Sequence, residues 1–156
     1  MATHSEEVYS LMIPTVQGNI LLPNTNVAEI VPFSNVDLFE QGDRPKWFLG
    51  HLLWRGKDIP LISVDVISGS EDPQANKRSR VAITHTLNAN TELPYIAIVV
   101  QGIPRLSHVT PENIKCIDAD VTSGAEKMKV TVDGVEAAIP DLDKLEEMIL
   151  ATESAA

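Results

Sequence analysis

The dipeptide Asp133-Gly134 constrains the fold of this chain more than any other short segment. Apolar and polar residues alternate before it and an apolar residue follows it, the apolar positions being Met128, Val130, Val132 and Val135. Asp-Gly between alternating residues is the strongest short-range signal for a β-hairpin, because both residues of a tight type I′ turn need a positive φ. The segment therefore predicts two antiparallel strands joined by a tight turn.

The first half of the chain carries two more hairpin signals. Residues 49–54 and 59–64 are short apolar runs that meet at a turn, Arg55-Gly56-Lys57-Asp58. Residues 8–13 and 19–22 flank the glycine-containing turn Gln17-Gly18-Asn19. Both segments predict antiparallel strand pairs.

The second half predicts a strand with one apolar face and a strand that is apolar throughout. Val81, Ile83, His85 and Leu87 fall on one face of an alternating segment, and a polar turn at 87–93 follows it. Residues 95–100 are continuously apolar, which is typical of a strand covered on both faces. We expect His85 to be a hydrogen-bonded core histidine.

Helices are predicted at two places. Residues 110–112, Thr-Pro-Glu, combine a cap, a first-position proline and an acid near the positive end of a short helix. From about residue 141 to 152, Leu142, Leu145 and Ile149 recur at helical spacing. This apolar stripe predicts a terminal helix packed on a β-barrel.

The remaining segments are less regular. Residues 24–31 predict either a turn of helix or extended chain, ended by Pro32. Residues 34–45 predict an exposed loop, and the polar stretch 68–80 predicts the boundary between two halves.

A weak internal repeat relates the two halves. Val8, Val27 and Ile30 correspond to Val81, Val100 and Ile103 at a constant offset of 73 positions, and Arg55-Gly56 is set against Asp133-Gly134 after a small register slip. The repeat favours two similar β-lobes, about residues 8–68 and 79–150, over one large sheet.

Composition argues against several classes of partner. The chain of 156 residues has a net charge of −10, so nucleic acid and anionic membrane surfaces are disfavoured. Charges and prolines interrupt every long apolar run, which argues against membrane insertion. Cys116 is the only cysteine, and the N-terminal residues lack the features of a signal peptide. A cytoplasmic location is expected.

No catalytic or metal-binding pattern is found in the sequence. The histidines, His4, His51, His85 and His108, have no carboxylate or cysteine at ligand spacing. Adjacent acids such as Glu71-Asp72 and the basic cluster 77–80 are interpreted as solvated surface. We therefore predict a binding protein without enzymatic activity, metal or cofactor.

The segment from Pro45 to Asp65 resembles the CheW-like coupling domain family. The family's pattern places proline, glycine and Arg-Gly before an apolar-Pro-apolar strand that ends in Asp, and the matching residues here are Pro45, Gly50, Arg55, Gly56, Pro60 and Asp65. Leu22-Pro23, Val27-Ala28-Glu29-Ile30 and residues 95–103 resemble further family segments, so the resemblance covers most of residues 8–150 as a single domain.

The resemblance implies an all-β fold with minor helices. It implies two intertwined five-stranded SH3-like β-barrel lobes with an apolar groove between them and a C-terminal helix. It also implies an adaptor that links the cytoplasmic tip of a methyl-accepting chemoreceptor to the regulatory domain of a CheA-like histidine kinase. Four departures from the family pattern, His51, Trp54, Gln101 and Pro140, suit an accessory adaptor of a chemosensory system for pili and twitching motility.

The expected partner-binding residues are Arg55, Trp54, Val27, Glu29, Ile30, Val99 and Val100, while Gly50 and Gly56 are expected to permit tight bends. Structural alternatives remain open for each of the binding residues. Arg55 could instead pair with Asp58 or Asp65, Trp54 and the apolar residues could belong to the core, and Glu29 could be a solvated charge.

Two alternative functions also remain. The first is a small β-barrel enzyme or ligand-binding module with an inter-lobe pocket lined by His85, His51 and Tyr95. The second, an OB-like oligonucleotide-binding barrel, is disfavoured by the acidity of the chain.

Overall fold

The computed structural model describes residues 8–40, 42, 44–87, 92–117 and 126–154. The strands are β1 (Val8–Pro14), β2 (Asn19–Pro23), β3 (Val27–Pro32), β4 (Val36–Leu38), β5 (Phe48–Trp54), β6 (Lys57–Ile62), β7 (Arg80–His85), β8 (Tyr95–Val100), β9 (Arg105–Val109), β10 (Ile114–Cys116), β11 (Glu126–Val132) and β12 (Val135–Pro140). The helices are the 3₁₀ turn η2 (Asn24–Asn26), α1 (Val64–Ile67) and α2 (Leu142–Ser154). The chain is thus mostly β, as predicted.

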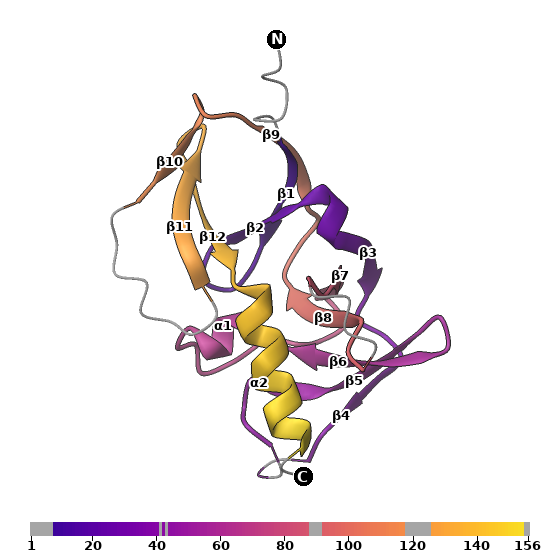
Figure 1. Cartoon of the computed structure of the whole chain (residues 1–156). Coiled ribbons are helices and arrows are strands. Elements are labelled where there is room, and N and C mark those ends of the chain that lie inside the picture. Colours follow the sequence, from indigo (N-terminus) through magenta and orange to yellow (C-terminus); the bar gives the residue numbers. More distant parts are fainter. Residues whose placement is uncertain (1–7, 41, 43, 88–91, 118–125, 155–156) are drawn as a thin grey trace.

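The strands form two sheets, one above the other in Figure 1, with α2 running alongside the lower one. The upper sheet has the order β10-β11-β12-β2-β1-β9, and the lower sheet has the order β3-β7-β8-β6-β5-β4. Each sheet has six strands rather than the predicted five. The extra pairing arises because short strands such as β4 and β10, of three residues each, add to the sheet edges.

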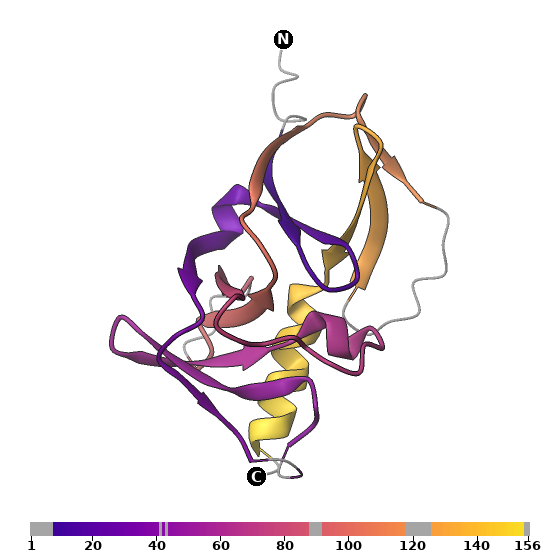
Figure 2. The same cartoon turned by 180° about the vertical axis from the view of Figure 1, so that it is seen from behind.

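The two halves of the chain exchange their first strand pairs, as both views show (Figures 1 and 2). The upper sheet combines β1 and β2 with β9 to β12, whereas the lower sheet combines β7 and β8 with β3 to β6. The predicted lobe boundaries, 8–68 and 79–150, are therefore wrong for the sheets. The physical reason is that β2 pairs in parallel with β12, and β8 in parallel with β6, so each lobe is completed by strands from the other half.

The predicted internal repeat has a structural counterpart. Strand β1 corresponds to β7 and β2 to β8, and the hairpin β5–β6 corresponds to β11–β12 in the order of the sheets. Both hairpins close through two-residue turns, Arg55-Gly56 and Asp133-Gly134, with φ values of 50° and 76° in the first and 51° and 82° in the second. These values match a type I′ turn, as the Asp-Gly signal predicted.

The core lies between and within the lobes. Its largest cluster includes Ile13, Ile98 and the three residues of the α2 stripe, Leu142, Leu145 and Ile149. Asp141 accepts a hydrogen bond from the Lys144 backbone N–H at 3.1 Å and so caps α2. The terminal helix and its packing are confirmed, as is the complete burial of residues 96–100 in β8.

Several local predictions are wrong. Residues 110–112 form a turn, because the Asn113 side chain accepts from the Thr110 backbone N–H and the chain must reverse from β9 into β10. The predicted loop 34–45 contains β4, and Val64 begins α1 after the cap Ser63 instead of ending a strand. His85 is exposed rather than buried. The predicted turn at 87–93 lies mostly outside the described residues.

Candidate partner-binding surface

Arg55 stands at the tip of the β5–β6 hairpin. Its side chain is 70% exposed, and its φ of 50° is a left-handed conformation that costs a non-glycine residue free energy. The first central position of a type I′ turn favours Asn, Asp or Gly, and in this hairpin it is occupied by Arg55 instead. Arg55 is one of the described non-glycine residues with a positive φ, together with Asn35, Gln74 and Asp133.

Three predicted site residues meet at this tip. Glu29 Oε1 on β3 accepts a hydrogen bond from Trp54 Nε1 at 2.9 Å and lies 3.4 Å from Arg55 Nη2. The Arg55 guanidinium also lies over the Trp54 ring, 4.6 Å from its centroid. Arg55 is thus held on two sides while most of it faces solvent.

The alternative in which Arg55 pairs with Asp58 or Asp65 is not found among the described residues, where its ion-pair partner is Glu29. Asp65 is buried in α1 and accepts from the backbone N–H groups of Val16 and Gln17, both at 3.0 Å. Its carboxylate therefore ties α1 to the β1–β2 turn, far in sequence from the hairpin tip.

Trp54 belongs mainly to the core. It is 9% exposed and meets the Tyr95 ring edge-on, with centroids 5.0 Å apart. Lys57 Nζ lies 5.3 Å from the Tyr95 centroid, and the exposed His85 ring lies 5.1 Å from it. Sequence reasoning did not single out Lys57, and it considered Tyr95 only as a lining residue of a ligand pocket. The cross-strand pairing of Trp54 with Lys57 places Lys57 beside these rings.

The apolar candidates separate into two groups. Val99 and Val100 on β8 are 0% exposed, so they form core contacts and are excluded as partner contacts in this structure. The reason is that β8 is central in its sheet and covered on both faces. Val27 and Ile30 on β3 are half-buried and pack against the inter-lobe core, which is a different cluster from the one that contains Trp54.

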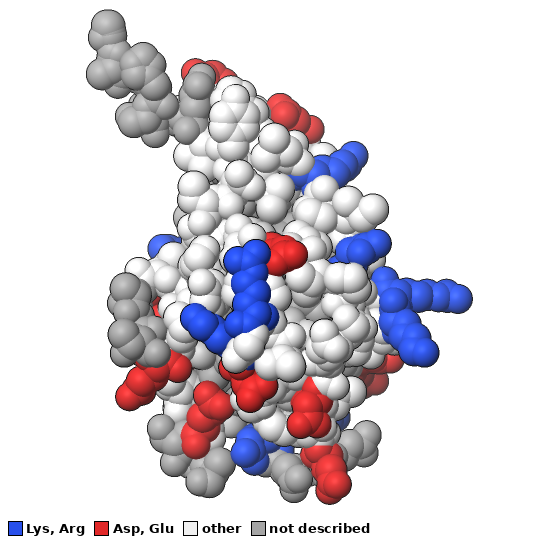
Figure 3. All heavy atoms as spheres, turned by 90° about the vertical axis from the view of Figure 1, so that its right-hand side faces the viewer, with Lys and Arg blue, Asp and Glu red and all other residues white. Residues whose placement is uncertain are grey.

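The face that carries β3 and the β5–β6 turn is viewed in Figure 3. Basic side chains stand near its centre, in contact with an acidic one, while other acidic side chains gather along its lower part (Figure 3). Most of the surface above them is uncharged.

The two candidate glycines have different roles. Gly56 has a φ of 76° in the turn, as expected. Gly50 lies inside β5, not at a bend, and a Cβ there would come 2.0 Å from the backbone carbonyl oxygen of Asp37. Gly50 is therefore needed for the close approach of β4.

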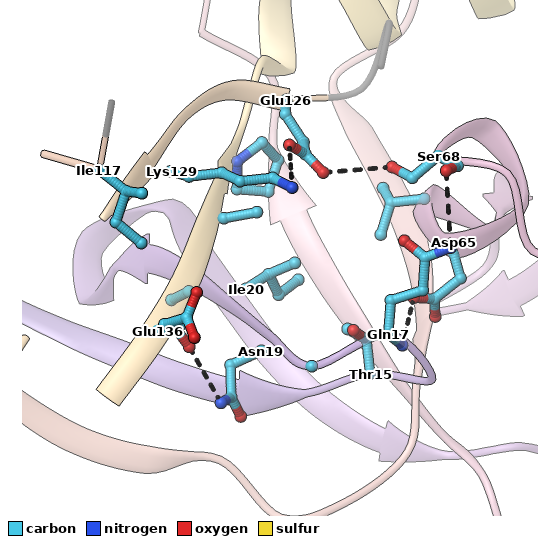
Figure 4. Close-up of a pocket in the computed structure, with 15 residues that line it drawn as sticks. Thr15, Gln17, Asn19, Ile20, Asp65, Ser68, Ile117, Glu126, Lys129 and Glu136 are labelled. Atoms are coloured by element: carbon cyan, nitrogen blue, oxygen red, sulfur yellow. Dashed lines mark hydrogen bonds and ion pairs between the residues drawn. The ribbon is translucent and has the colours of Figure 1, made fainter. Parts of the chain in front are cut away.

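A polar cavity of about 130 Å³ lies between the β1–β2 turn, α1 and the β11–β12 pair (Figure 4). Asp65, Glu126, Lys129 and Glu136 line it, with Lys129 Nζ 3.8 Å from Glu126 Oε2. His85, His51 and Tyr95, which were expected to line such a pocket, do not. His51 and Tyr95 instead line a second cavity of about 380 Å³, beside Glu153 of α2.

Within the described residues, no group of three or more His, Cys, Asp or Glu side chains is arranged to hold a metal ion. Among the helices in the described part of the chain, none has the length and apolar character to cross a membrane. The fold is that of a small two-lobed β-barrel protein with an exposed arginine at one hairpin tip.

The family model of the CheW-like domain matches residues 11–148, and the chain belongs to that family. The structure is similar to that of the scaffolding protein TtCheW from Thermoanaerobacter tengcongensis, with a TM-score of 0.68 and 18% identity over 86% of this chain and 89% of that chain. No curated protein matches the sequence. Membership places the chain among the scaffold domains of chemotaxis signalling, which are not enzymes.

Proposed function

We propose that this protein is a non-enzymatic adaptor that couples the cytoplasmic tip of a methyl-accepting chemoreceptor to the regulatory domain of a CheA-like histidine kinase. The observation that carries the proposal is the conformation of Arg55, an exposed guanidinium kept at a positive φ and braced by Glu29 and Trp54. A guanidinium braced on two sides loses little side-chain entropy when a partner carboxylate binds it.

Strand β3, which holds Glu29 near Arg55, also carries partly accessible aliphatic residues. Val27 and Ile30 are half-buried and lie on the same strand as Glu29. A chemoreceptor tip is a helical hairpin, and an amphipathic helix lays its apolar face against aliphatic residues of this kind while an acidic residue pairs with a nearby cation. We assign the receptor to β3 and the Arg55 tip, and place the complex in the cytoplasm.

The accessory role in a system for pili and twitching motility belongs to the same proposal. Three residues that depart from the family pattern make contacts of their own. Trp54 donates to Glu29, His51 Nε2 lies 3.3 Å from Glu153 Oε2, and Gln101 donates to the backbone carbonyl of Gln74 at 3.2 Å. These contacts within the chain are consistent with a divergent member of the family, as the proposed accessory role requires.

Binding measurements test the proposal. The protein is titrated separately with a kinase regulatory domain and with a receptor signalling fragment from the same organism. Arg55→Glu is expected to weaken receptor binding at least tenfold, or by about 1.4 kcal/mol, while circular dichroism stays unchanged. Arg78→Glu, which alters an exposed arginine of the loop before β7, is the matched control. If the protein binds neither partner at tens of micromolar, the proposal is wrong.

A further inference from the structure

The four edges of the two sheets are not equally protected. Strands β4 and β10 are only three residues long, and β3 carries a register shift between Val27 and Glu29 and ends at Pro32. Short length, bulges, charges and proline are the devices by which proteins keep edge strands from pairing with other chains. Strand β9, of five residues, pairs regularly with β1 along its length and ends its sheet.

An apolar row runs along this edge. The register places Tyr9 opposite His108 and Leu11 opposite Leu106, so these side chains share one face of the β1–β9 pair. The Tyr9 and His108 rings are stacked with centroids 4.7 Å apart. Tyr9 is 56% exposed and Leu106 is 63% exposed, which is unusual for two large apolar residues side by side on a sheet edge.

The composition of the two strands at this edge differs from that of the whole chain. Neither β1 nor β9 contains an Asp or a Glu, although the chain as a whole has a net charge of −10. Arg105 and His108 are the ionisable residues of β9. An approach of two copies through β9 therefore brings together no carboxylate of β1 or β9.

We propose that β9 pairs with β9 of a second copy, antiparallel about a two-fold axis at Ser107. In this register Ser107 faces Ser107 of the second copy, Leu106 faces His108, and Arg105 faces Val109. No like charges are placed opposite each other, and each exposed Leu106 is covered by the stacked His108–Tyr9 pair of the other copy.

One contact at the edge is compatible with the pairing. The His108 carbonyl accepts from Asn113 Nδ2 at 2.8 Å. A carbonyl oxygen has two lone pairs and can accept a second hydrogen bond from the added strand. The resulting dimer presents two Arg55 tips, so it binds clustered partners with higher avidity than the single chain.

Sedimentation equilibrium on the full chain tests the dimer, from low micromolar to high micromolar concentration. The average mass is expected to rise toward that of two chains. Leu106→Lys should weaken the association at least tenfold, while Leu53→Lys, which changes another exposed leucine on β5, should leave it unchanged. A wild-type protein that stays monomeric throughout, or a Leu106→Lys variant that associates like wild type, overturns the proposal.

Disulfide trapping tests the register. In a Cys116→Ser background, Ser107→Cys is expected to form a disulfide-linked dimer under mild oxidation. Residues opposite each other in antiparallel strands have Cα atoms about 4.5 or 5.5 Å apart, both within the range that a disulfide spans. Asp37→Cys, on the β4 edge in the same background, is the control. Equal yields of linked dimer from both cysteines overturn the Ser107 register.

Discussion

The carboxylate of Glu29 on β3 accepts a hydrogen bond of 2.9 Å from the indole N–H of Trp54 at the end of β5. The two residues are 25 positions apart, and their strands lie at different places in the same sheet. Because the same carboxylate oxygen is also close to the Arg55 guanidinium, this bond sets where the cation stands. Arg55 is therefore positioned by tertiary contacts as well as by its turn.

Removing the indole donor tests this arrangement. Trp54→Phe keeps an aromatic platform for Arg55 but leaves Glu29 without its N–H partner, so the free energy of unfolding is expected to fall by about 1 kcal/mol in urea titrations. Affinity for the receptor fragment is expected to fall as well, because Arg55 loses its fixed position. Trp47→Phe, which leaves the Glu29 contact intact, should not weaken binding; equal losses in both variants would contradict the role of Trp54.

A substitution that relieves the strained φ at Arg55 should raise stability and lower receptor affinity. Arg55→Asn places a residue that favours positive φ at the first position of the turn, so the free energy of unfolding is expected to rise by about 0.5–1 kcal/mol. The lost ion pair with Glu29 offsets little of this gain, since both side chains are substantially exposed. Receptor affinity should fall. Chemical denaturation and titration check both effects, and an unstable Arg55→Asn protein would show that the arginine itself holds the hairpin.

Because β4 lies so close to β5, a side chain at Gly50 is expected to destabilise the protein. A Cβ at Gly50 would meet the Asp37 carbonyl oxygen at 2.0 Å, whereas a Cβ at Gly56 meets nothing within 4 Å. Gly50→Ala should thus cost about 3 kcal/mol or more through strand displacement, and Gly56→Ala about 1 kcal/mol through its φ alone. Thermal unfolding of the two variants measures the difference. A Gly56→Ala loss as large as that of Gly50→Ala would argue against the close approach.

Asp65 is expected to matter for stability rather than for partner binding. Asp65→Ala removes the acceptor of the Val16 and Gln17 backbone N–H groups, and the free energy of unfolding is expected to fall by about 2–3 kcal/mol. Asp72→Ala, which removes an exposed acceptor of the Gln74 backbone N–H, should cost less than about 1 kcal/mol. Calorimetry compares the two. Retained stability in Asp65→Ala would show that the link between α1 and the β1–β2 turn is dispensable.

Much of the secondary structure was predictable because its signals are local. Asp133-Gly134 and Arg55-Gly56 sit in two-residue turns, and Leu142, Leu145 and Ile149 form the buried stripe of α2. The helix predicted at residues 110–112 failed because a cap, a proline and an acid describe a helix start but not its length. Strand β10 begins at Ile114 and pairs with β11, so the chain between β9 and β10 is long enough only for a turn.

The candidate site was predictable as a set of residues but not as an arrangement. Glu29, Trp54 and Arg55 were each expected to contact partners, and the structure brings them together. Val99 and Val100 could not be separated from Val27 and Ile30 in sequence, because all four are aliphatic strand residues. Their burial differs because β8 is central in the sheet and β3 is at its edge.

By itself, the sequence determined the hairpin turns, the doubly covered strand at 95–100 and the amphipathic terminal helix, since each depends on residues a few positions apart. The resemblance to the CheW-like family also predicted the fold class. Only the tertiary structure decided the exchange of strand pairs between the halves, the Glu29 partner of Arg55 and the open edge at β9. These features depend on which distant strands pair, and that choice is made by burial of the whole core rather than by local propensity.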